Sequence, residues 1–387
     1  MKELPATHQR FPAIDLMRGI VIVLMALDHT RDFLGASSID PRNTAEPLLF
    51  MTRWITHFCA PVFAFLAGAS ARFAMGKYSK AWLASRSLTL RGIWLIVLEL
   101  TLVRFAWTFV FSFSFILLQV LWALGVGMVF LSFLTGLPPS LVGVTGAVMI
   151  LSHNLLDSIQ AASLGPASWI WHLLHEPHLV QLASGQKVWA LYPLIPWVGV
   201  MALGFSFAPN LAPHARRSRF FYTWGVTMVA LFMVLRFTGA YGDPHPWQPQ
   251  TTLLASLLEF VNCEKYPPSL QFLLMTLGPM LVAYPLISRI RGAAAIALLT
   301  FGREPMLFYV LHIPLIHALA VLLAAWNHNS TTWLFGGFPL LNKPAEYGMP
   351  LYSIYLFWLL ILLALYPLSR WYGSEKSIHR QWWHKLL

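Results

Sequence analysis

Several ionisable side chains of this 387-residue chain stand within long apolar runs. A charge near the middle of a membrane helix costs about 2.5–3.5 kcal/mol on insertion scales, so such groups pair, line a cavity or do chemistry. In the first run, Asp28 and His29 are adjacent. An imidazole beside a carboxylate is a natural general base, because the carboxylate can fix its tautomer. We therefore expect a catalytic role for Asp28 and His29; an ordinary helix end meeting water is the alternative.

The same run places Arg18 on the helical face of His29, through Ile22 and Met25 at spacings of three and four residues. At 1.5 Å per residue, Arg18 and His29 are about 16 Å apart. Arg18 is thus expected toward the inner side, where a structural pair with Asp15 is the alternative to a binding role.

A second histidine, His57, stands near the outer end of the next apolar run, at about the depth of His29. The two runs are joined by one loop, so a shared site is plausible, with His57 or Arg31 stabilising an oxyanion. A packed, hydrogen-bonded core histidine is the alternative interpretation of His57.

Other polar residues interrupt later runs and are candidate binding groups for substrate or cofactor. A structural ion pair explains Glu99 and Arg104 as well as binding does, and interhelical hydrogen bonding is the alternative for His312. The full set of candidate binding residues is Arg18, Arg31, Glu99, Arg104, Gln119, Arg303 and His312.

The composition indicates what must position these groups. The chain is 57% hydrophobic and 11% charged, whereas a soluble domain carries about 25% charged residues. We predict an all-α, polytopic transmembrane helical bundle forming one domain over residues 1–387. About ten spans are expected, at 13–34, 54–75, 90–111, 113–134, 138–156, 188–208, 219–239, 269–288, 303–326 and 352–370, each near the 20 residues that a span requires.

Lysine and arginine alternate between loops in the way that the positive-inside rule predicts. The longer loops, 35–53, 157–187, 240–268 and 327–351, hold few of them and are expected outside. This places both termini in the cytoplasm of a cell whose inner (plasma) membrane holds the protein. The net charge of +11 therefore reflects topology, and no nucleic-acid partner is expected. The apolar stretch 293–301 either lies along the interface or begins the ninth span.

Some chemistries lack their sequence patterns. The histidines are scattered singly, without an HExxH or His/Cys cluster, so no metal is predicted. There is no P-loop and no GxSxG elbow, and no cleavable signal peptide is expected. Cys59 lies in an apolar run and Cys263 in a loop, so no disulfide is expected.

Five stretches of the sequence show a family resemblance. AIDLMRGIVIVLMALDH and FCAPVFAFLAGAS resemble the opening of the heparan-alpha-glucosaminide N-acetyltransferase family and its bacterial relatives. YPLIPWVGVMALG, KYPPSLQFLLMTLGP and FGREPMLFYVLHIPLIH match further along. The resemblance implies a membrane acetyltransferase that uses cytosolic acetyl-CoA as co-substrate and acylates an amine or hydroxyl beyond the membrane, such as that of a sugar or envelope glycan.

One departure from that family concerns the catalytic histidine. The lysosomal enzyme carries it in the first outer loop, but GASSIDPRNTAEPLLFMTRW contains no histidine. His29 stands where that enzyme has an asparagine, and His57 where it has an aspartate. The first helix is also similar to that of acyltransferase-3 membrane enzymes, whose Arg…His pattern matches Arg18…His29. This second resemblance favours His29 as the base.

Two rival functions remain open. A transporter or permease of a small polar or amphipathic solute would also need broken helices and buried charges. A membrane sensor or assembly factor would tolerate changes at His29 and His57. The acceptor, the acyl chain and the oligomeric state, including a homodimer, are left open.

Overall fold

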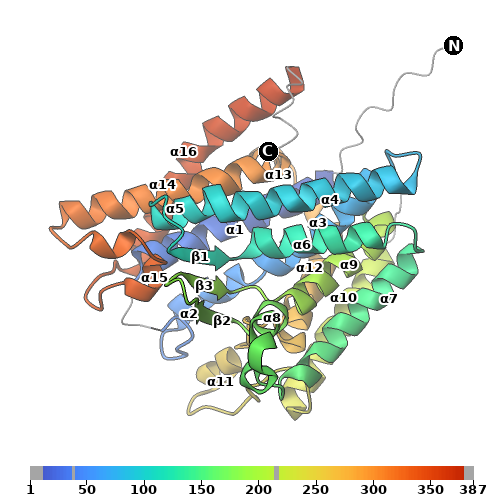
Figure 1. Ribbon diagram of the computed structural model, residues 1–387, viewed down its shortest axis with the longest axis horizontal. Coiled ribbons are helices and arrows are strands. Elements are labelled where there is room, and N and C mark those ends of the chain that lie inside the picture. The colour runs from blue at the N-terminus through green and yellow to red at the C-terminus, as the bar shows by residue number, and fades with distance from the viewer. Residues whose placement is uncertain (1–11, 37–39, 213–217, 379–387) are drawn as a thin grey trace.

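The computed structural model describes residues 12–36, 40–212 and 218–378, and these form a bundle of helices with one small sheet (Figure 1). The predicted positions of both chain ends in the cytoplasm concern residues outside this described part. The helices up to residue 211 are α1 (Pro12–Leu34), α2 (Pro47–Thr56), α3 (Cys59–Met75), α4 (Ala81–Leu98), α5 (Arg104–Thr108), α6 (Val120–Phe133), α7 (Pro139–Ser152), α8 (Ser168–Leu174) and α9 (Leu194–Leu211). Those that follow are α10 (Ser218–Thr238), α11 (Leu253–Phe260), α12 (Leu270–Ile287), α13 (Gly292–Arg303), α14 (Pro305–Trp326), α15 (Pro339–Asn342) and α16 (Leu351–Ile378).

Seven helical segments of the described chain are long and apolar enough to cross a membrane, which confirms a multi-pass helical bundle. They are Pro47–Met75, Pro139–Leu156, Leu194–Leu211, Ser218–Thr238, Leu270–Ile287, Pro305–Trp326 and Leu351–Lys376. The first of these joins α2 and α3, and the second adds the 3-10 turn η2 (His153–Leu156) to α7. Ten spans stay a prediction, because α1, α4 and α6 fall outside this set.

Helix α1 lies at the centre of the bundle, in contact with α2, α3, α12, α13, α14 and α16. Its ionisable residues are therefore surrounded by protein, which removes the cost of facing lipid. The observed helix matches the predicted span 13–34 within one residue.

Close approach of α1 and α13 depends on two glycines. A Cβ built on Gly19 would lie 2.1 Å from the Leu298 carbonyl oxygen, and one on Gly302 would lie 1.8 Å from that of Asp15. Any side chain at either position would force the helices apart, so these backbones pack directly on each other, as small residues permit in membrane bundles.

Three short strands form a sheet in the order β1-β3-β2, which the prediction of helices alone did not include. β1 (Phe115–Leu118) pairs in parallel with β3 (Lys187–Ala190), which pairs antiparallel with β2 (His178–Gln181). The predicted starts of the fourth span at 113 and the sixth at 188 are therefore wrong: α6 begins at Val120 and α9 at Leu194. Short apolar runs such as FILL suit a strand as well as a helix, and hydropathy does not separate the two.

The ends of other predicted spans also differ from the ends of the observed helices. The third predicted span began at 90, but α4 already begins at Ala81 and passes into a π-helix, η1 (Glu99–Val103), before α5. The stretch 293–301 is a separate helix, α13, which ends just before Pro305 begins α14. A proline is favoured at a first helical position because its missing N–H has no partner there anyway.

Candidate active site

A pair of histidines joins α1 to α14. Nδ1 of His29 lies 2.8 Å from Nε2 of His312, and the two rings stack with centroids 5.0 Å apart. His312 is fully buried, whereas His29 is partly exposed. Two of the predicted site residues, 283 positions apart, thus meet in space.

The tautomers of this pair follow from its other partners. Nδ1 of His312 faces the carbonyl oxygens of Phe308 and Tyr309 at 3.0 and 2.8 Å. Carbonyls only accept, so Nδ1 of His312 carries the proton and its Nε2 accepts from Nδ1–H of His29. Nε2 of His29 is then left with a free lone pair, which is what a general base requires.

Aromatic side chains surround the pair. Trp107 of α5 packs edge-on against His29 at 5.2 Å and stacks on Phe33. Nε1 of Trp107 and the hydroxyl of Tyr309 are buried without a hydrogen-bond partner. Buried polar groups without partners are costly, so these two are candidate contacts to a substrate. The sequence analysis missed both, because an aromatic residue in a membrane helix gives no signal of its role.

Asp28 belongs to an ionic network beside the pair rather than to the pair itself. Its Oδ1 lies 2.7 Å from Nη2 of Arg31 and accepts from the Thr56 hydroxyl at 2.7 Å. Lys265 lies 3.8 Å from Oδ2. The hypothesis that Asp28 orients His29 is corrected: the hydrogen bond that orients this ring is the one that its Nδ1–H donates to Nε2 of His312.

Arg31 is held between two carboxylates, Asp28 and Asp32. Its Nη1 is buried and has no hydrogen-bond partner. This nitrogen is a candidate donor to a developing negative charge.

The C-terminal end of α1 is closed by Lys343 from the loop between α15 and α16. Its Nζ donates to the carbonyl oxygens of Asp32 and Gly35 at 2.6 and 2.7 Å, which are end groups of α1 without helical partners. Burial lowers the pKa of Lys343 to about 8. The amine still carries its charge at pH 7 and favours the negative end of the helix dipole.

His57 does not join the histidine pair through any recorded contact. It lies in the turn between α2 and α3, is 1% exposed, and its ring packs 5.3 Å from that of Phe272. Both of its ring nitrogens are buried without a hydrogen-bond partner. The predicted site shared by His57 and His29 stays a prediction; their neighbours in sequence, Thr56 and Asp28, are hydrogen-bonded to each other.

Glu99 and Arg104 each bind backbone, and the described contacts include no ion pair between them. Glu99 accepts from the backbone N–H groups of Leu121 and Trp122 and so caps α6, whose N-cap residue is Gln119. Arg104 donates to the carbonyl oxygens of the turn after α5, including those of Val110, Phe111 and Ser112. These contacts favour structural roles over the predicted binding roles.

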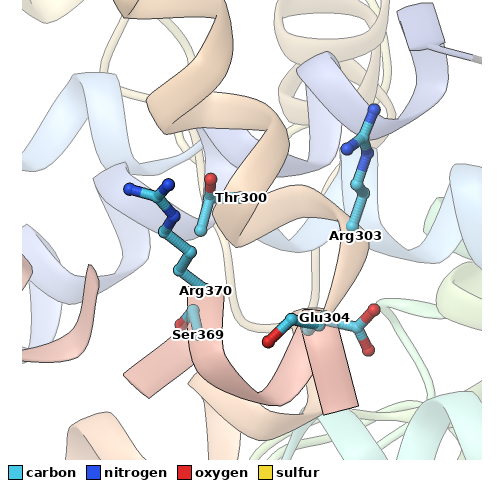
Figure 2. A pocket seen from close by; sticks show the side chains of 7 residues that line it. Thr300, Arg303, Glu304, Ser369 and Arg370 are labelled. Atoms are coloured by element: carbon cyan, nitrogen blue, oxygen red, sulfur yellow. The ribbon is translucent and has the colours of Figure 1, made fainter. Parts of the chain in front are cut away.

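A pocket of about 540 Å³ lies between α13 and α16, and we call it the inner pocket after the side on which the predicted topology places it. It is lined by Thr300, Arg303, Glu304, Ser369, Arg370, Gly373 and Ser374. Figure 2 shows Arg303 and Arg370 on either side of Thr300. Two guanidinium groups suit an anionic ligand such as a phosphate.

Arg18 lies on α1, the helix that packs against α13. Its guanidinium is 3.3 Å from Asp15 and also donates to the Ser70 hydroxyl. The predicted Asp15–Arg18 pair is therefore present within α1, and the hydrogen bond from Arg18 to Ser70 connects α1 to α3.

The comparison with protein families shows which family the chain belongs to. The family described as "Heparan-alpha-glucosaminide N-acetyltransferase, catalytic" matches residues 10–241, more than half of the chain. The chain belongs to this family. The matched part contains His29 and Trp107, while His312 and the inner pocket lie beyond it. No curated protein matched the chain. Family and apolar helices together identify a multi-pass membrane protein of acetyltransferase type.

Proposed function

We propose that this protein transfers an acetyl group from cytosolic acetyl-CoA to an amine or hydroxyl of a sugar or envelope glycan on the opposite side of the inner membrane. The observation that carries the proposal is the free lone pair on Nε2 of His29, fixed by the hydrogen bond to His312. Family membership supplies the reaction type.

The inner pocket is the proposed entrance for the donor. Arg303 and Arg370 would bind phosphate groups of coenzyme A, and Arg18 stands on the neighbouring helix. The distance from Arg18 to His29 is about 16 Å along α1, roughly the length of an extended pantetheine arm. The thioester would then reach the level of His29.

The transfer itself needs one proton acceptor and one oxyanion donor. Nε2 of His29 takes the proton of the acceptor as its nitrogen or oxygen attacks the thioester carbonyl. Nη1 of Arg31 and Nε1 of Trp107 are the buried N–H groups available to the oxyanion. The C–S bond then breaks, and the leaving coenzyme A thiolate takes up the proton that His29 holds.

The test is incubation of purified protein with labelled acetyl-CoA and glucosamine-terminated or envelope glycans. Replacing His29 with Gln should lower turnover by about 10²–10⁴-fold, the usual contribution of a general base. Thermal unfolding in detergent checks that the variant folds. Replacing His245, an exposed histidine of an outer loop, is the matched control. Full turnover by His29→Gln would remove the proposed base, and counterflow of a solute without acylation would favour a transporter.

A further inference from the structure

Three potential metal ligands converge outside the proposed active site, in the segment between α7 and α9. His172 lies near the end of α8, Glu176 in the turn that follows, and His178 at the start of β2. One ligand atom from each lies within 4.8 Å of the other two. Figure 1 shows α8 and the sheet that contains β2 in the same part of the molecule.

The two better buried members of this cluster are already oriented by backbone groups. Nδ1 of His172 lies 3.3 Å from the carbonyl oxygen of Glu176, so its Nδ1–H points at an acceptor and its Nε2 keeps a lone pair. Oε2 of Glu176 accepts from the backbone N–H of Ala161 at 3.0 Å. Metal-binding histidines and carboxylates are commonly held by such outer hydrogen bonds, which fix the tautomer and the ring or carboxylate plane.

The donor set indicates the class of metal. The rings of His172 and His178 stack at 4.5 Å with 16° between their planes. Because an imidazole lone pair lies in the plane of its ring, one ring must rotate out of this stack for both to bind one ion beside the Glu176 carboxylate. Two histidine nitrogens and one carboxylate oxygen suit Zn²⁺, with a fourth position left for water. His175, between them in sequence, faces away, since its Nε2 bonds Asp157 at 2.9 Å.

We propose that His172, Glu176 and His178 bind one zinc ion on the outer side of the membrane. The ion would join α8 to β2, and through β3 to β1, which leads into α6. It is separate from the His29–His312 pair and acts on the stability of the outer segment. This site revises the expectation of no metal, which rested on HExxH and His/Cys motifs that this spacing does not match.

The test uses the full chain without a histidine tag, in detergent, titrated with ZnCl₂. We expect one zinc per chain after dialysis, by elemental analysis, and a higher Tm, because a ligand that binds only the folded state stabilises it. His172→Ala/His178→Ala should lose both effects, while His245→Ala, on another outer loop, should keep both.

Glu176→Gln guards against misfolding of the double variant, since the amide still offers an oxygen to Ala161. Its zinc affinity should fall by at least about tenfold, because even partners outside the ligand set contribute that much. Wild-type protein that takes up no zinc at micromolar concentrations, or a double variant with unchanged stoichiometry, would overturn the site.

Discussion

Two other buried histidines, His317 of α14 and His153 of η2, differ from the His29–His312 pair in what their ring nitrogens face. His317 has the carbonyl oxygens of Ala106 and Leu334 at 2.9 and 2.8 Å, one on each nitrogen. His153 is held in the same way by Ile150 and Pro268. His29, by contrast, has a nitrogen atom of His312 on one side and no carbonyl on either.

This difference distinguishes structural histidines from the proposed base better than burial does. A ring with carbonyl oxygens at both nitrogens joins two chain segments and has neither nitrogen open to a substrate. His317 in this way ties α14 to α5 and to η5 (Thr332–Leu334). In the His29–His312 pair, only the outermost nitrogen is left for a substrate.

The largest expected effect that tests this comparison is at His312. Replacing it with Ala removes the acceptor that fixes the His29 tautomer, and kcat should fall by about 10²-fold, the lower range for a base that loses its orientation. His312→Gln, whose amide oxygen can accept a hydrogen bond, should recover part of the loss. Steady-state kinetics and a pH–rate profile of both variants test whether His312 orients His29. Unchanged kinetics would show that it does not.

Next comes His317, where stability rather than activity should change. His317→Leu leaves two buried carbonyl oxygens without a partner, each costing about 1–3 kcal/mol. The Tm in detergent should fall, while kcat per folded molecule stays near that of the wild type. If kcat falls without any change in Tm, the division between the two kinds of histidine fails.

A smaller effect is expected at the inner pocket. Arg303→Ala or Arg370→Ala removes one guanidinium that would bind the donor's phosphates, which is worth about tenfold in affinity, or 1.4 kcal/mol. KM for acetyl-CoA should rise and kcat should change little, since this contact is the same in ground and transition states. Arg289→Ala, outside the pocket lining, is the control. An equal rise in KM in this variant would show that the overall positive charge, and not the pocket, determines the affinity for acetyl-CoA.

The smallest effect is expected at His57. His57→Leu removes two buried nitrogens that have no partner, so Tm should stay equal or rise. Turnover should remain within about threefold of the wild type, since no recorded contact links His57 to His29. A loss as large as that of His29→Gln would instead place His57 in the mechanism, as the sequence first indicated.

Much of the site could be predicted because α1 is continuous. The helical spacing of Arg18 and His29 follows from one uninterrupted run, and the structure keeps it. The partner of His29 could not be predicted, since His312 is 283 residues away and one sequence contains no information on such contacts. The partners of Glu99 could not be predicted for a related reason: they are backbone N–H groups at the start of α6, which leave no trace in residue types.

The sheet shows a second limit. Hydropathy places the segment 115–118 in a membrane span, but its backbone pairs with 187–190. Phe115 and Trp189 both pack against Phe338 before α15. That packing is a tertiary effect, and it decides between strand and helix where local pattern does not.

The glycine contacts between α1 and α13 restrict how the protein can open during turnover. With Gly19 against Leu298 and Gly302 against Asp15, the two backbones interlock and cannot slide past each other. Arg18, His29 and Arg303 therefore belong to one rigid body made of α1 and α13. If the proposed function holds, a path between the two sides of the membrane opens by movement of other helices around this body, which keeps the proposed entrance for the donor and the proposed base at a fixed separation.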